Sequence, residues 1–336
     1  MKEQSINGKV FSEKKGVPEQ PLVSFVLLAY NQENFIQEAV RSVLAQTFEP
    51  LEIFMIDDCS TDNTFSLMEK EVCEYNGEYT VKLYQNDKNI GLAASLNRAW
   101  EETNGDFLVV QAGDDVSLPE RTQLLVNAWR NTEPTPDLVY SDITVVDDQG
   151  KVVESIKRLP RDLQISHMLE KGMAAISGCA CAYSRRLHHI YGPLNEKVLQ
   201  EDAVYPFRAM LERGICLVEK PLVRYRIHSN NVSAPDIGTG ARRLRDRQWT
   251  IRWKENQLAV INEWMGAWKI SGRKDPQSLK KLIYWQKMRQ VLCEYEIAIF
   301  PWVLIVPIKG VLWGLPTKYM ASLFWKSLFQ KNSLKS

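Results

Sequence analysis

The sequence lacks several features that would indicate particular classes of protein. Its 336 residues include only 6 cysteines, and no two of them form a Cys-x-x-Cys pair, so neither a zinc site nor a disulfide framework is indicated. Charge of one sign is not in excess either, because 42 Lys and Arg face 41 Asp and Glu, whereas a nucleic-acid binder is usually strongly basic. We therefore expect a globular protein of a reducing, cytoplasmic compartment, with no nucleic-acid partner.

Long apolar runs are also missing. The longest, Ile297–Ile308, is interrupted by Pro301 and Pro307, and a membrane-spanning helix needs about 20 apolar residues. Residues 1–20 are polar and have no apolar core of a secretory signal, so we expect a flexible arm there. The sequence predicts no transmembrane segment.

No glycine-rich phosphate loop follows the first apolar run. The chain reads Tyr-Asn-Gln-Glu-Asn at residues 30–34, in place of GxGxxG or GxxxxGK[ST]. Dinucleotide-binding and P-loop proteins are therefore disfavoured. A nucleotidyltransferase is disfavoured too, because it would want glycines with Arg or Lys at this turn.

Short β-rich runs alternate with helical patterns from residue 22 onward. This alternation predicts an α/β fold with a doubly wound, mostly parallel sheet. Ser60 or Thr61 could cap the second helix. The predicted strands are 22–29, 51–56, 81–84, 107–110, 138–146, 179–183, 216–218 and 222–227, and the predicted helices are 35–44, a segment after 61, 92–102, a segment after 119, and 203–213.

Polar clusters follow the first four predicted strands. They are Tyr30-Asn31, Asp57-Asp58, Asn86-Asp87 and Asp114-Asp115. Ligands of such sheets bind outside the carboxyl ends of the strands, so we expect these clusters on one rim. The Asp114-Asp115 pair could hold Mg²⁺ or Mn²⁺, which prefer oxygen ligands, or it could be a solvated turn.

Two further positions could carry chemistry. Asp202 of the Glu201-Asp202 pair could be a general base for a hydroxyl nucleophile, or it could cap the helix that follows. His228, one of only four histidines, could be structural, or it could meet phosphates or a metal together with Arg226.

Five segments, in order and at suitable spacing, resemble an inverting family 2 glycosyltransferase with the GT-A fold. The resemblance covers roughly residues 21–233. The segments read VSFVLLAYNQENFIQEAVRSVLAQTF, IFMIDDCSTDNT, NIGLAASLNRAW, GDFLVVQAGDDVSLPER and QEDAVYPFRAMLERGICLVEKPLVRYRIH.

The resemblance implies roles for individual residues. Tyr30 would stack on the base of a nucleotide sugar, Asp58 would accept from a base N–H, and Asp202 would be the catalytic base. The other implied contacts are Asn31, Asn97, Glu201 and Arg226 with the nucleotide sugar, and Asp114, Asp115 and His228 with the metal. The chain departs from the family at Ala112, where the first carboxylate of the Asp-x-Asp motif would stand, and at Leu96, where an Arg is common.

The last hundred residues differ in character. Eight of the ten tryptophans lie between 249 and 325, so we expect a GT-A domain at 21–235 and a helical, Trp- and Lys-rich region at 236–336. Ile297–Ser336 contains five lysines and no acid. Such a tail suits an anionic membrane surface, and the alternative is a helical cap that buries the aromatics.

The expected function is metal-dependent, inverting transfer of a sugar from a nucleotide sugar to a hydroxyl of a glycan or lipid-linked glycan, in bacterial surface-polysaccharide assembly. The first donor expected is a UDP-sugar. The expected location is the cytoplasm, with a peripheral position on the inner face of the membrane as an option. The alternative is a non-catalytic glycan- or sugar-nucleotide-binding protein on a decayed transferase scaffold, which Ala112 would suit.

Overall fold

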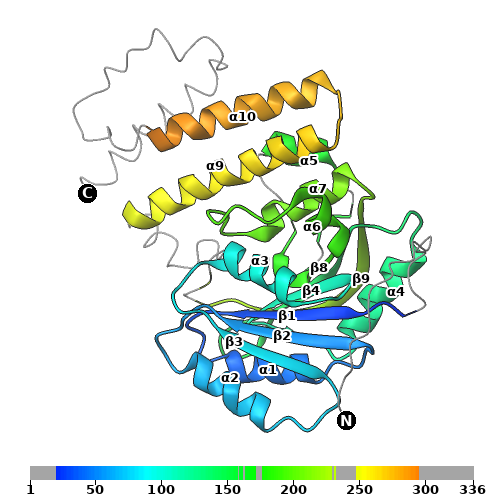
Figure 1. The fold of residues 1–336 in the computed structure, drawn as a ribbon, viewed down its shortest axis with the longest axis vertical. Helices are drawn as coiled ribbons and strands as arrows, with labels where there is room; N and C mark the ends of the chain where they lie inside the picture. Colours follow the sequence, from blue (N-terminus) through cyan, green and yellow to red (C-terminus); the bar gives the residue numbers. More distant parts are fainter. Residues whose placement is uncertain are drawn as a thin grey trace, which may run out of the picture.

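A central nine-stranded sheet with helices on both faces organises the molecule (Figure 1). The computed structural model describes residues 20–157, 159–161, 163–171, 176–228, 231 and 247–294. The strand order is β3-β2-β1-β4-β8-β6-β9-β5, and β7 pairs with β6. The predicted arm 1–20, except its last residue, and the tail Ile297–Ser336 lie outside the described residues.

The first half of the sheet is parallel, as the alternation of strands and helices predicts. β1 pairs with β2 and β4 in parallel, and β2 pairs with β3 in parallel. This prediction is confirmed to within a few residues at each end. The elements are β1 Val23–Ala29, α1 Ile36–Leu44, β2 Leu51–Asp57, α2 Thr64–Cys73, β3 Thr80–Gln85, α3 Leu92–Glu102 and β4 Phe107–Ala112.

The second half of the sheet is mixed. β8 runs antiparallel to both β4 and β6, while β9 is parallel to β6 and antiparallel to the short β5. The two predicted strand pieces at 216–218 and 222–227 form one strand, β9, which continues through Pro221. The elements are β5 Val116–Ser117, α4 Arg121–Asn131, β6 Leu138–Val146, β7 Val152–Lys157, α5 Ile165–Lys171, η1 Gly178–Ala180, β8 Cys181–Ser184, α6 Arg185–Tyr191, η2 Glu201–Ala203, α7 Tyr205–Leu211 and β9 Ile215–Arg226.

Two hydrophobic clusters cover the two faces of the sheet. Side chains alternate along a strand, so Phe25 and Leu27 of β1 join one cluster while Val26 joins the other. All three side chains are fully buried. A strand that is apolar on both faces is typical of a parallel sheet between two helical layers.

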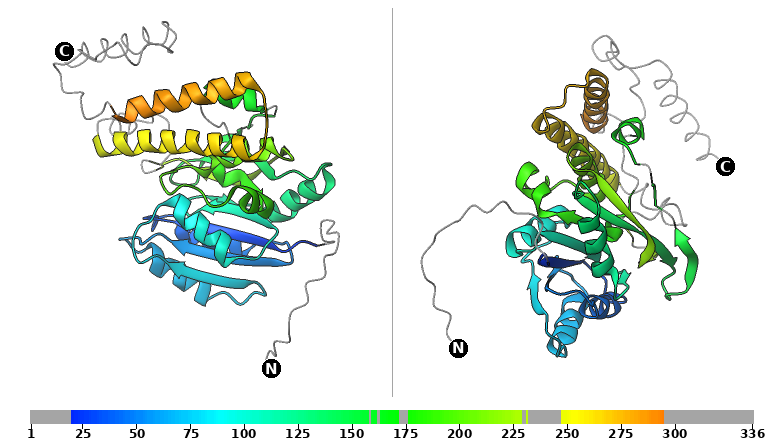
Figure 2. Two further views of the ribbon diagram at one scale, coloured as in Figure 1. Left: turned by 45° about the horizontal axis from the view of Figure 1, so that its top comes forward. Right: turned by 90° about the vertical axis from the view of Figure 1, so that its right-hand side faces the viewer.

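The C-terminal helices α9 Arg247–Ile270 and α10 Pro276–Glu294 pack on one of these two clusters, the one that contains Val26 (Figures 1 and 2). Trp264 is fully buried and donates its indole N–H to the carbonyl oxygen of Ala203 at 2.8 Å. Trp285 is also buried and donates to the carbonyl oxygen of Leu169 at 2.6 Å. The described tryptophans at these positions therefore act as a cap on the domain. Within the described part of the chain, no helix is both long and apolar enough to cross a membrane.

The helix start after β2 differs from the prediction. α2 begins at Thr64 with Asn63 at its N-cap position, so the prediction of Ser60 or Thr61 as the cap was wrong. Both residues instead bind the neighbouring turn, because Asn31 donates its backbone N–H to Ser60 Oγ at 2.8 Å and accepts from the backbone N–H of Thr61 at 2.8 Å. Tertiary partners at the rim outweigh the local capping preference.

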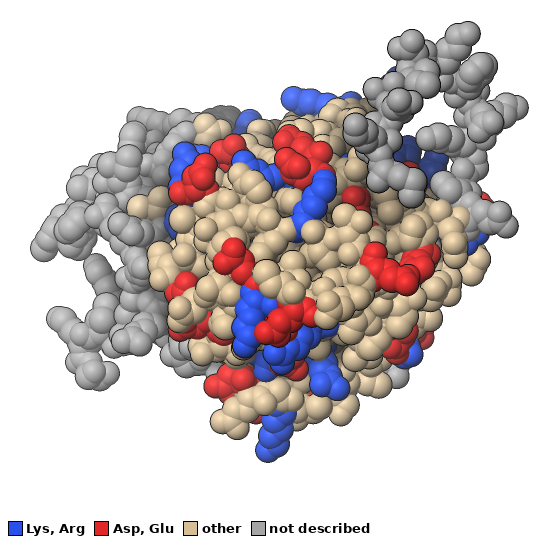
Figure 3. Space-filling view, turned by 60° about the horizontal axis from the view of Figure 1, so that its bottom comes forward, with Lys and Arg blue, Asp and Glu red and all other residues tan. Residues whose placement is uncertain are grey.

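One face of the molecule, seen in Figure 3, shows acidic and basic side chains interspersed among uncharged ones. No broad area of a single sign covers the part of that face that the structure describes. This pattern agrees with the near-zero formal charge of +1 for the whole chain.

Candidate active site

The turn after β1 is fastened to the turn after β2. Asn31 has a positive φ of 52°, which asparagine tolerates better than most residues, and its side chain and backbone both bind the segment after β2. This leaves Tyr30 on the surface, with 44% of the residue exposed. An exposed ring on a fixed turn is suited to stacking on a base.

Asp58 organises the loop that follows β3. Its Oδ1 accepts from the backbone N–H of Ile90 and from Nδ2 of Asn86, both at 2.8 Å, and its Oδ2 accepts from the N–H of Gly91 at 2.8 Å. Gly91 has a φ of 87°, a conformation that favours glycine. A carboxylate offers about four acceptor positions, so three hydrogen bonds leave room for one base N–H.

Sequence reasoning missed Arg98 beside this loop. Its guanidinium donates to Asn86 Oδ1 at 2.8 Å and lies 4.4 Å from the ring centroid of the partly exposed Tyr84. The family often has an arginine at position 96, which is Leu96 in this chain, and Arg98 stands two positions later. A basic side chain thus lies close to the Asp58 loop despite the departure at Leu96.

Asn97 has a different environment from the one expected. Its Nδ2 donates to the carbonyl oxygen of Leu194, and its Oδ1 accepts from the N–H of the same residue, both at 2.8 Å. The amide therefore binds α3 to the segment after α6. Its second N–H and a lone pair of Oδ1 are not used by this pair of hydrogen bonds.

Asp114 and His228 are brought together from the ends of β4 and β9. Their Oδ2 and Nε2 atoms lie 2.9 Å apart, and Asn231, which sequence reasoning missed, donates Nδ2 to the same oxygen at 3.3 Å. The His228 ring also packs on Phe35, with ring centroids 4.7 Å apart. The position of Asn231 three residues after the Arg-x-His motif is the one signal that could have indicated it.

Asp115 points inward. It is 1% exposed, and its Oδ1 accepts the backbone N–H of Arg226 at 2.9 Å. Burial, and then the neighbouring charge of Asp114, raises the pKa of Asp115 well above its usual range. Of the three predicted metal ligands, the structure therefore places Asp114 and His228 side by side and turns Asp115 away from them.

Arg226 is used inside the protein. Its guanidinium donates to the carbonyl oxygen of Asp114 at 3.0 Å and to Glu38 Oε2 at 2.6 Å, and the residue is only 3% exposed. Further hydrogen bonds reach the carbonyl oxygens of Asp147 and Asp148. In this arrangement Arg226 holds the Asp114 turn in place, and one N–H of Nη2 is not used by these hydrogen bonds.

Glu201 and Asp202 lie on the short helix η2, next to the turn η1. Asp202 Oδ2 accepts the backbone N–H of Gly178 at 2.8 Å. Burial raises the pKa of Asp202 to about 6, against the lowering effect of this hydrogen bond. Burial and the charge of Asp202 raise the pKa of Glu201 to about 8. Burial thus makes the pair a better proton acceptor than two exposed carboxylates would be, and the pair titrates as a unit.

The alternative role of Asp202 as a helix cap is contradicted. α7 begins at Tyr205, its N-cap residue is Val204, and no side chain caps it. The carboxylate of Asp202 is directed to Gly178 instead. Because Asp202 does not cap α7, its carboxylate can accept a proton from a substrate.

The Asp114 and His228 pair fits a divalent cation that is completed by a ligand. Mg²⁺ is usually bound through one or two carboxylates and takes its remaining ligands from phosphates and water, and Asp114 would supply such a carboxylate. His228 Nε2 now hydrogen-bonds to Asp114 Oδ2 at 2.9 Å, and it would exchange this bond for the ion. Among the described residues, no group of three or more His, Cys, Asp or Glu side chains is arranged to hold an ion.

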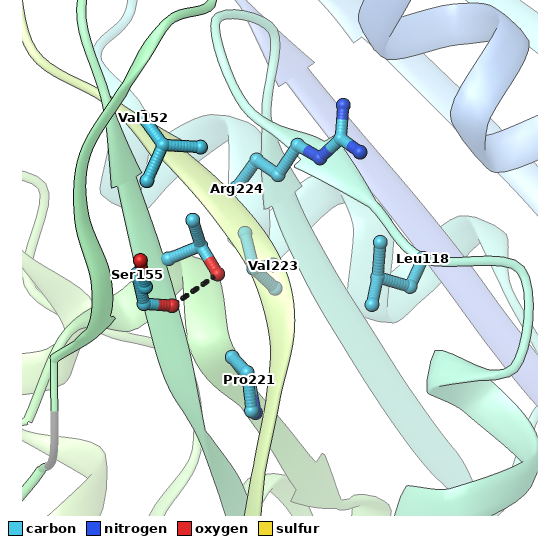
Figure 4. A pocket seen from close by; sticks show the side chains of 7 residues that line it. Leu118, Val152, Ser155, Pro221, Val223 and Arg224 are labelled. Carbon is cyan, nitrogen blue, oxygen red and sulfur yellow. Dashed lines mark hydrogen bonds between the residues drawn. The ribbon is translucent and has the colours of Figure 1, made fainter.

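A groove of about 300 Å³ lies on the strands β5, β6, β7 and β9 (Figure 4). Thr144 Oγ1 donates to the carbonyl oxygen of Ser155 at 2.9 Å across it. None of the predicted site residues lines the groove, although its Arg224 lies two positions before Arg226 on β9. Its lining consists of Leu118, Thr144, Val152, Ser155, Pro221, Val223 and Arg224.

Comparison with known sequences agrees with this arrangement. The profile of the family "Glycosyl transferase family 2" matches residues 24–191, half of the chain. The chain therefore belongs to glycosyl transferase family 2, and the resemblance found in the sequence is confirmed. This membership supports an enzyme of the nucleotide-sugar glycosyltransferase class.

Several relatives carry related names. An uncharacterised glycosyltransferase of Haemophilus influenzae is 28% identical over 228 residues, which cover 64% of this chain and 68% of that protein. EpsE of Bacillus subtilis, also named as a glycosyltransferase, is 37% identical over 130 residues, covering 39% and 46%. An uncharacterised glycosyltransferase of Rickettsia felis is 27% identical over 217 residues, covering 63% and 35%. The matched region thus spans less than half the length of the last two relatives.

Solved structures confirm the predicted GT-A-like fold. Staphylococcus aureus TarS 1-349 in complex with UDP has a TM-score of 0.54 at 16% identity, covering 83% of this chain and 75% of that one. The mannosyltransferase PcManGT of Pyrobaculum calidifontis, in complex with GDP-Man and Mn²⁺, has a TM-score of 0.52 at 19% identity, covering 91% and 81%. At these identities the likeness concerns the fold.

Proposed function

We propose that this chain is an inverting glycosyltransferase that moves a sugar from a nucleotide sugar to a hydroxyl of a glycan or lipid-linked glycan. The observation that carries the proposal is the turn η1, which contacts both halves of the site. Its Gly178 N–H binds Asp202, and its buried Cys179 thiol is close enough to Asp115, the neighbour of Asp114, for each group to affect the pKa of the other. One turn thus connects the proton acceptor to the acidic rim.

The chemistry needs a base on one side and a stabilised leaving group on the other. Asp202 takes the proton of the acceptor hydroxyl as its oxygen bonds to the anomeric carbon, and the bond from that carbon to the diphosphate breaks. A single displacement by this route inverts the anomeric configuration. Asp114 and His228 would hold a divalent cation, which supplies neutralisation of charge on the departing diphosphate.

The donor and the acceptor are narrower proposals. A structural neighbour holds UDP and another holds GDP-Man with Mn²⁺, so we propose a nucleoside diphosphate sugar, with a UDP-sugar as the first to test. Tyr30 and Asp58 would bind its base. A surface-polysaccharide acceptor, and a place at an anionic membrane on its cytoplasmic side, rest on the family resemblance and on the basic tail.

A binding protein without activity is the second candidate, and Ala112 favours it. A carboxylate is missing at this position of the Asp-x-Asp motif, at the end of β4. Retention of Asp114, His228 and Asp202 supports the enzyme instead. A decayed scaffold would not need a buried proton acceptor at η2.

The test begins with binding of UDP- and GDP-sugars with and without Mn²⁺, followed by transfer assays on Asp202→Asn and Asp114→Asn. Asp202→Asn should lower transfer by about 10²- to 10⁴-fold and leave donor binding intact. Asp114→Asn should abolish transfer and weaken Mn²⁺-dependent donor binding. Asp106→Asn, an exposed residue just before the other end of β4, is the control.

Three results would contradict the proposal. Normal turnover by Asp202→Asn would show that Asp202 is not the base. Unchanged activity and metal dependence of Asp114→Asn would show that Asp114 is not a metal ligand. Binding of nucleotide sugars with no transfer by the wild type would favour the non-catalytic alternative.

A further inference from the structure

We propose that helix α9 belongs to the catalytic machinery, because one of its faces holds the loop that carries Asp202. Asn256 and Trp264 are then positioning residues that act on the reaction through this loop. The inference rests on the proposed function in so far as Asp202 is the base. α9 lies beyond residues 24–191, which the family profile matches, so this role is an addition to the matched domain.

The loop depends on α9 because its own backbone forms no helix or strand between residues 192 and 200. Two of its amides are bound by side chains of α9. The N–H of Leu199 donates to Asn256 Oδ1, and the N–H of Asn195 donates to Glu263 Oε1, both at 2.8 Å. Asn256 is 2% exposed, so water offers the Leu199 amide little substitute.

A third contact lies next to the base itself. Trp264 donates its indole N–H at 2.8 Å to the carbonyl oxygen of Ala203, the residue that follows Asp202. The same indole stacks on Phe207 of α7, with ring centroids 4.8 Å apart and an angle of 11°. Trp264 therefore fixes the chain on the C-terminal side of Asp202, as Asn256 does on the N-terminal side.

The three side chains come from one face of α9. Asn256 and Glu263 are seven residues apart, which is two helical turns, and Trp264 follows directly. Glu263 also accepts from Arg208 of α7 at 2.6 Å, and this pair is 2% and 15% exposed. The helix thus binds the loop and the next helix as one rigid unit.

Positioning matters because Asp202 must reach the acceptor hydroxyl. A displacement of about 1 Å in a reacting group can cost on the order of 10²-fold in rate. The residues proposed for the donor base, Tyr30 and Asp58, lie at the ends of β1 and β2, and no described contact joins them to these α9 residues. Loss of α9 contacts should therefore lower kcat and leave the donor KM unchanged.

The first experiment compares Asn256→Leu, Asn256→Asp and Asn262→Leu in the full chain. Asn256→Leu removes the acceptor of the Leu199 amide, whereas Asn256→Asp keeps an acceptor oxygen there. Asn262→Leu is the matched control, because Asn262 is exposed on the same helix and bonds to Gln286 of α10. Measurements are kcat, donor KM and hydrogen exchange of residues 195–203.

Asn256→Leu should lower kcat by about 10- to 100-fold at unchanged donor KM and speed exchange of the Leu199 amide by about fivefold or more. For Asn256→Asp and Asn262→Leu, kcat and the exchange rate should stay within about threefold of the wild type, because both variants leave the loop bound to α9. If Asn256→Leu kept the wild-type kcat while its loop exchanged faster, Asn256 would hold the loop without affecting the rate of transfer. Either that result or unchanged exchange would overturn the inference.

A second variant keeps the inference testable if Asn256→Leu fails to fold. Trp264→Phe keeps an aromatic ring against Phe207 and loses the hydrogen bond to Ala203 together with part of the buried indole, so its unfolding free energy is measured beside kcat. It should lower kcat at unchanged donor KM, and an unchanged kcat would reject the role of Trp264. If the wild type transfers no sugar at all, the proposed function fails, and exchange of the loop still decides whether α9 holds it.

Discussion

At the scale of the residue, the buried pair Glu201 and Asp202 decides how activity responds to pH. The pKa of Asp202 is raised to about 6, and a base works only when ionised. We expect kcat/KM to fall about tenfold per pH unit below pH 6 and to level off above it. A pH profile of kcat/KM measures this, and a profile that stays flat down to pH 5 would contradict it.

Glu201 should make the protein less stable as pH rises. Its pKa is about 8 in the folded protein against an ordinary 4.5, so between these values the folded state holds a proton that the unfolded state has lost. The free energy of unfolding then decreases with rising pH, by up to about 1.4 kcal/mol per unit for one proton. Urea unfolding from pH 5 to 8 should show a smaller decrease for Glu201→Gln, and equal slopes would contradict this assignment.

A side chain at Gly178 would displace the buried carboxylate of Glu201. A Cβ at this position would lie 2.1 Å from Glu201 Oε1, and the same residue donates its N–H to Asp202. Gly178→Ala should therefore cost about 1–3 kcal/mol of unfolding free energy and lower kcat. Gly266→Ala, in open space within α9, is the control and should be neutral or stabilising. Equal behaviour of the two variants would show that η1 adapts to a side chain.

At the scale of the element, the junction of α7 and α9 rests on a buried ion pair. The side chains of Arg208 on α7 and Glu263 on α9 are 2% and 15% exposed. A second ion pair joins α9 to the loop 192–200, and its side chains, Lys197 and Glu255, are 63% and 42% exposed. Burial makes removal of one partner costly, because the other charge is left without compensation. The two pairs therefore offer an internal comparison.

Arg208→Met should lower the free energy of unfolding by about 3–5 kcal/mol, and Lys197→Met should lower it by less than about 1 kcal/mol. Urea unfolding at one pH measures both. Loss of the Arg208 hydrogen bond to the carbonyl oxygen of Gly192 contributes to the larger effect. Similar values for the two variants would mean that α9 is held mainly by its apolar contacts.

At the scale of the whole molecule, the C-terminal region has two parts with different expected roles. α9 and α10 bury Trp264, Trp268 and Trp285 against the domain, whereas the cap that the sequence left as an alternative concerns the aromatics of the tail and stays untested. Ile297–Ser336, with its five lysines, lies outside the described residues and remains a proposed contact with an anionic membrane. A chain that ends at Glu296 separates the two.

This shortened chain should stay folded, because it keeps both packed helices. Full-length protein should sediment with anionic vesicles more than with neutral ones, since each lysine near the headgroups contributes about 1 kcal/mol, an attraction that salt weakens. The shortened chain should bind less. Equal vesicle binding by both proteins would reject the membrane role, and a drop of several degrees in Tm would show that the tail packs on the domain.

The sequence by itself determined the parallel half of the sheet and the order of its polar turns. Apolar runs with a period of two or 3.6 are local signals, and each lies within ten or so residues, so β1 to β4 and their helices could be predicted. The same logic placed Tyr30, Asp58 and Asp114 at strand ends. β7 was missed because its six residues are all exposed, so no buried face marks it in the sequence.

Only the tertiary structure decided where the site side chains point and what they bind. Arg226 meets Glu38 across 188 residues of chain, Asn97 meets Leu194 across 97, and Asp202 meets Gly178 across 24. No local pattern records such partners, because a hydrogen bond depends on positions in space that the packing of distant elements creates. For the same reason, sequence alone could not separate a helix cap from a base at Asp202, or tell that Asp115 binds the Arg226 amide while Asp114 meets His228.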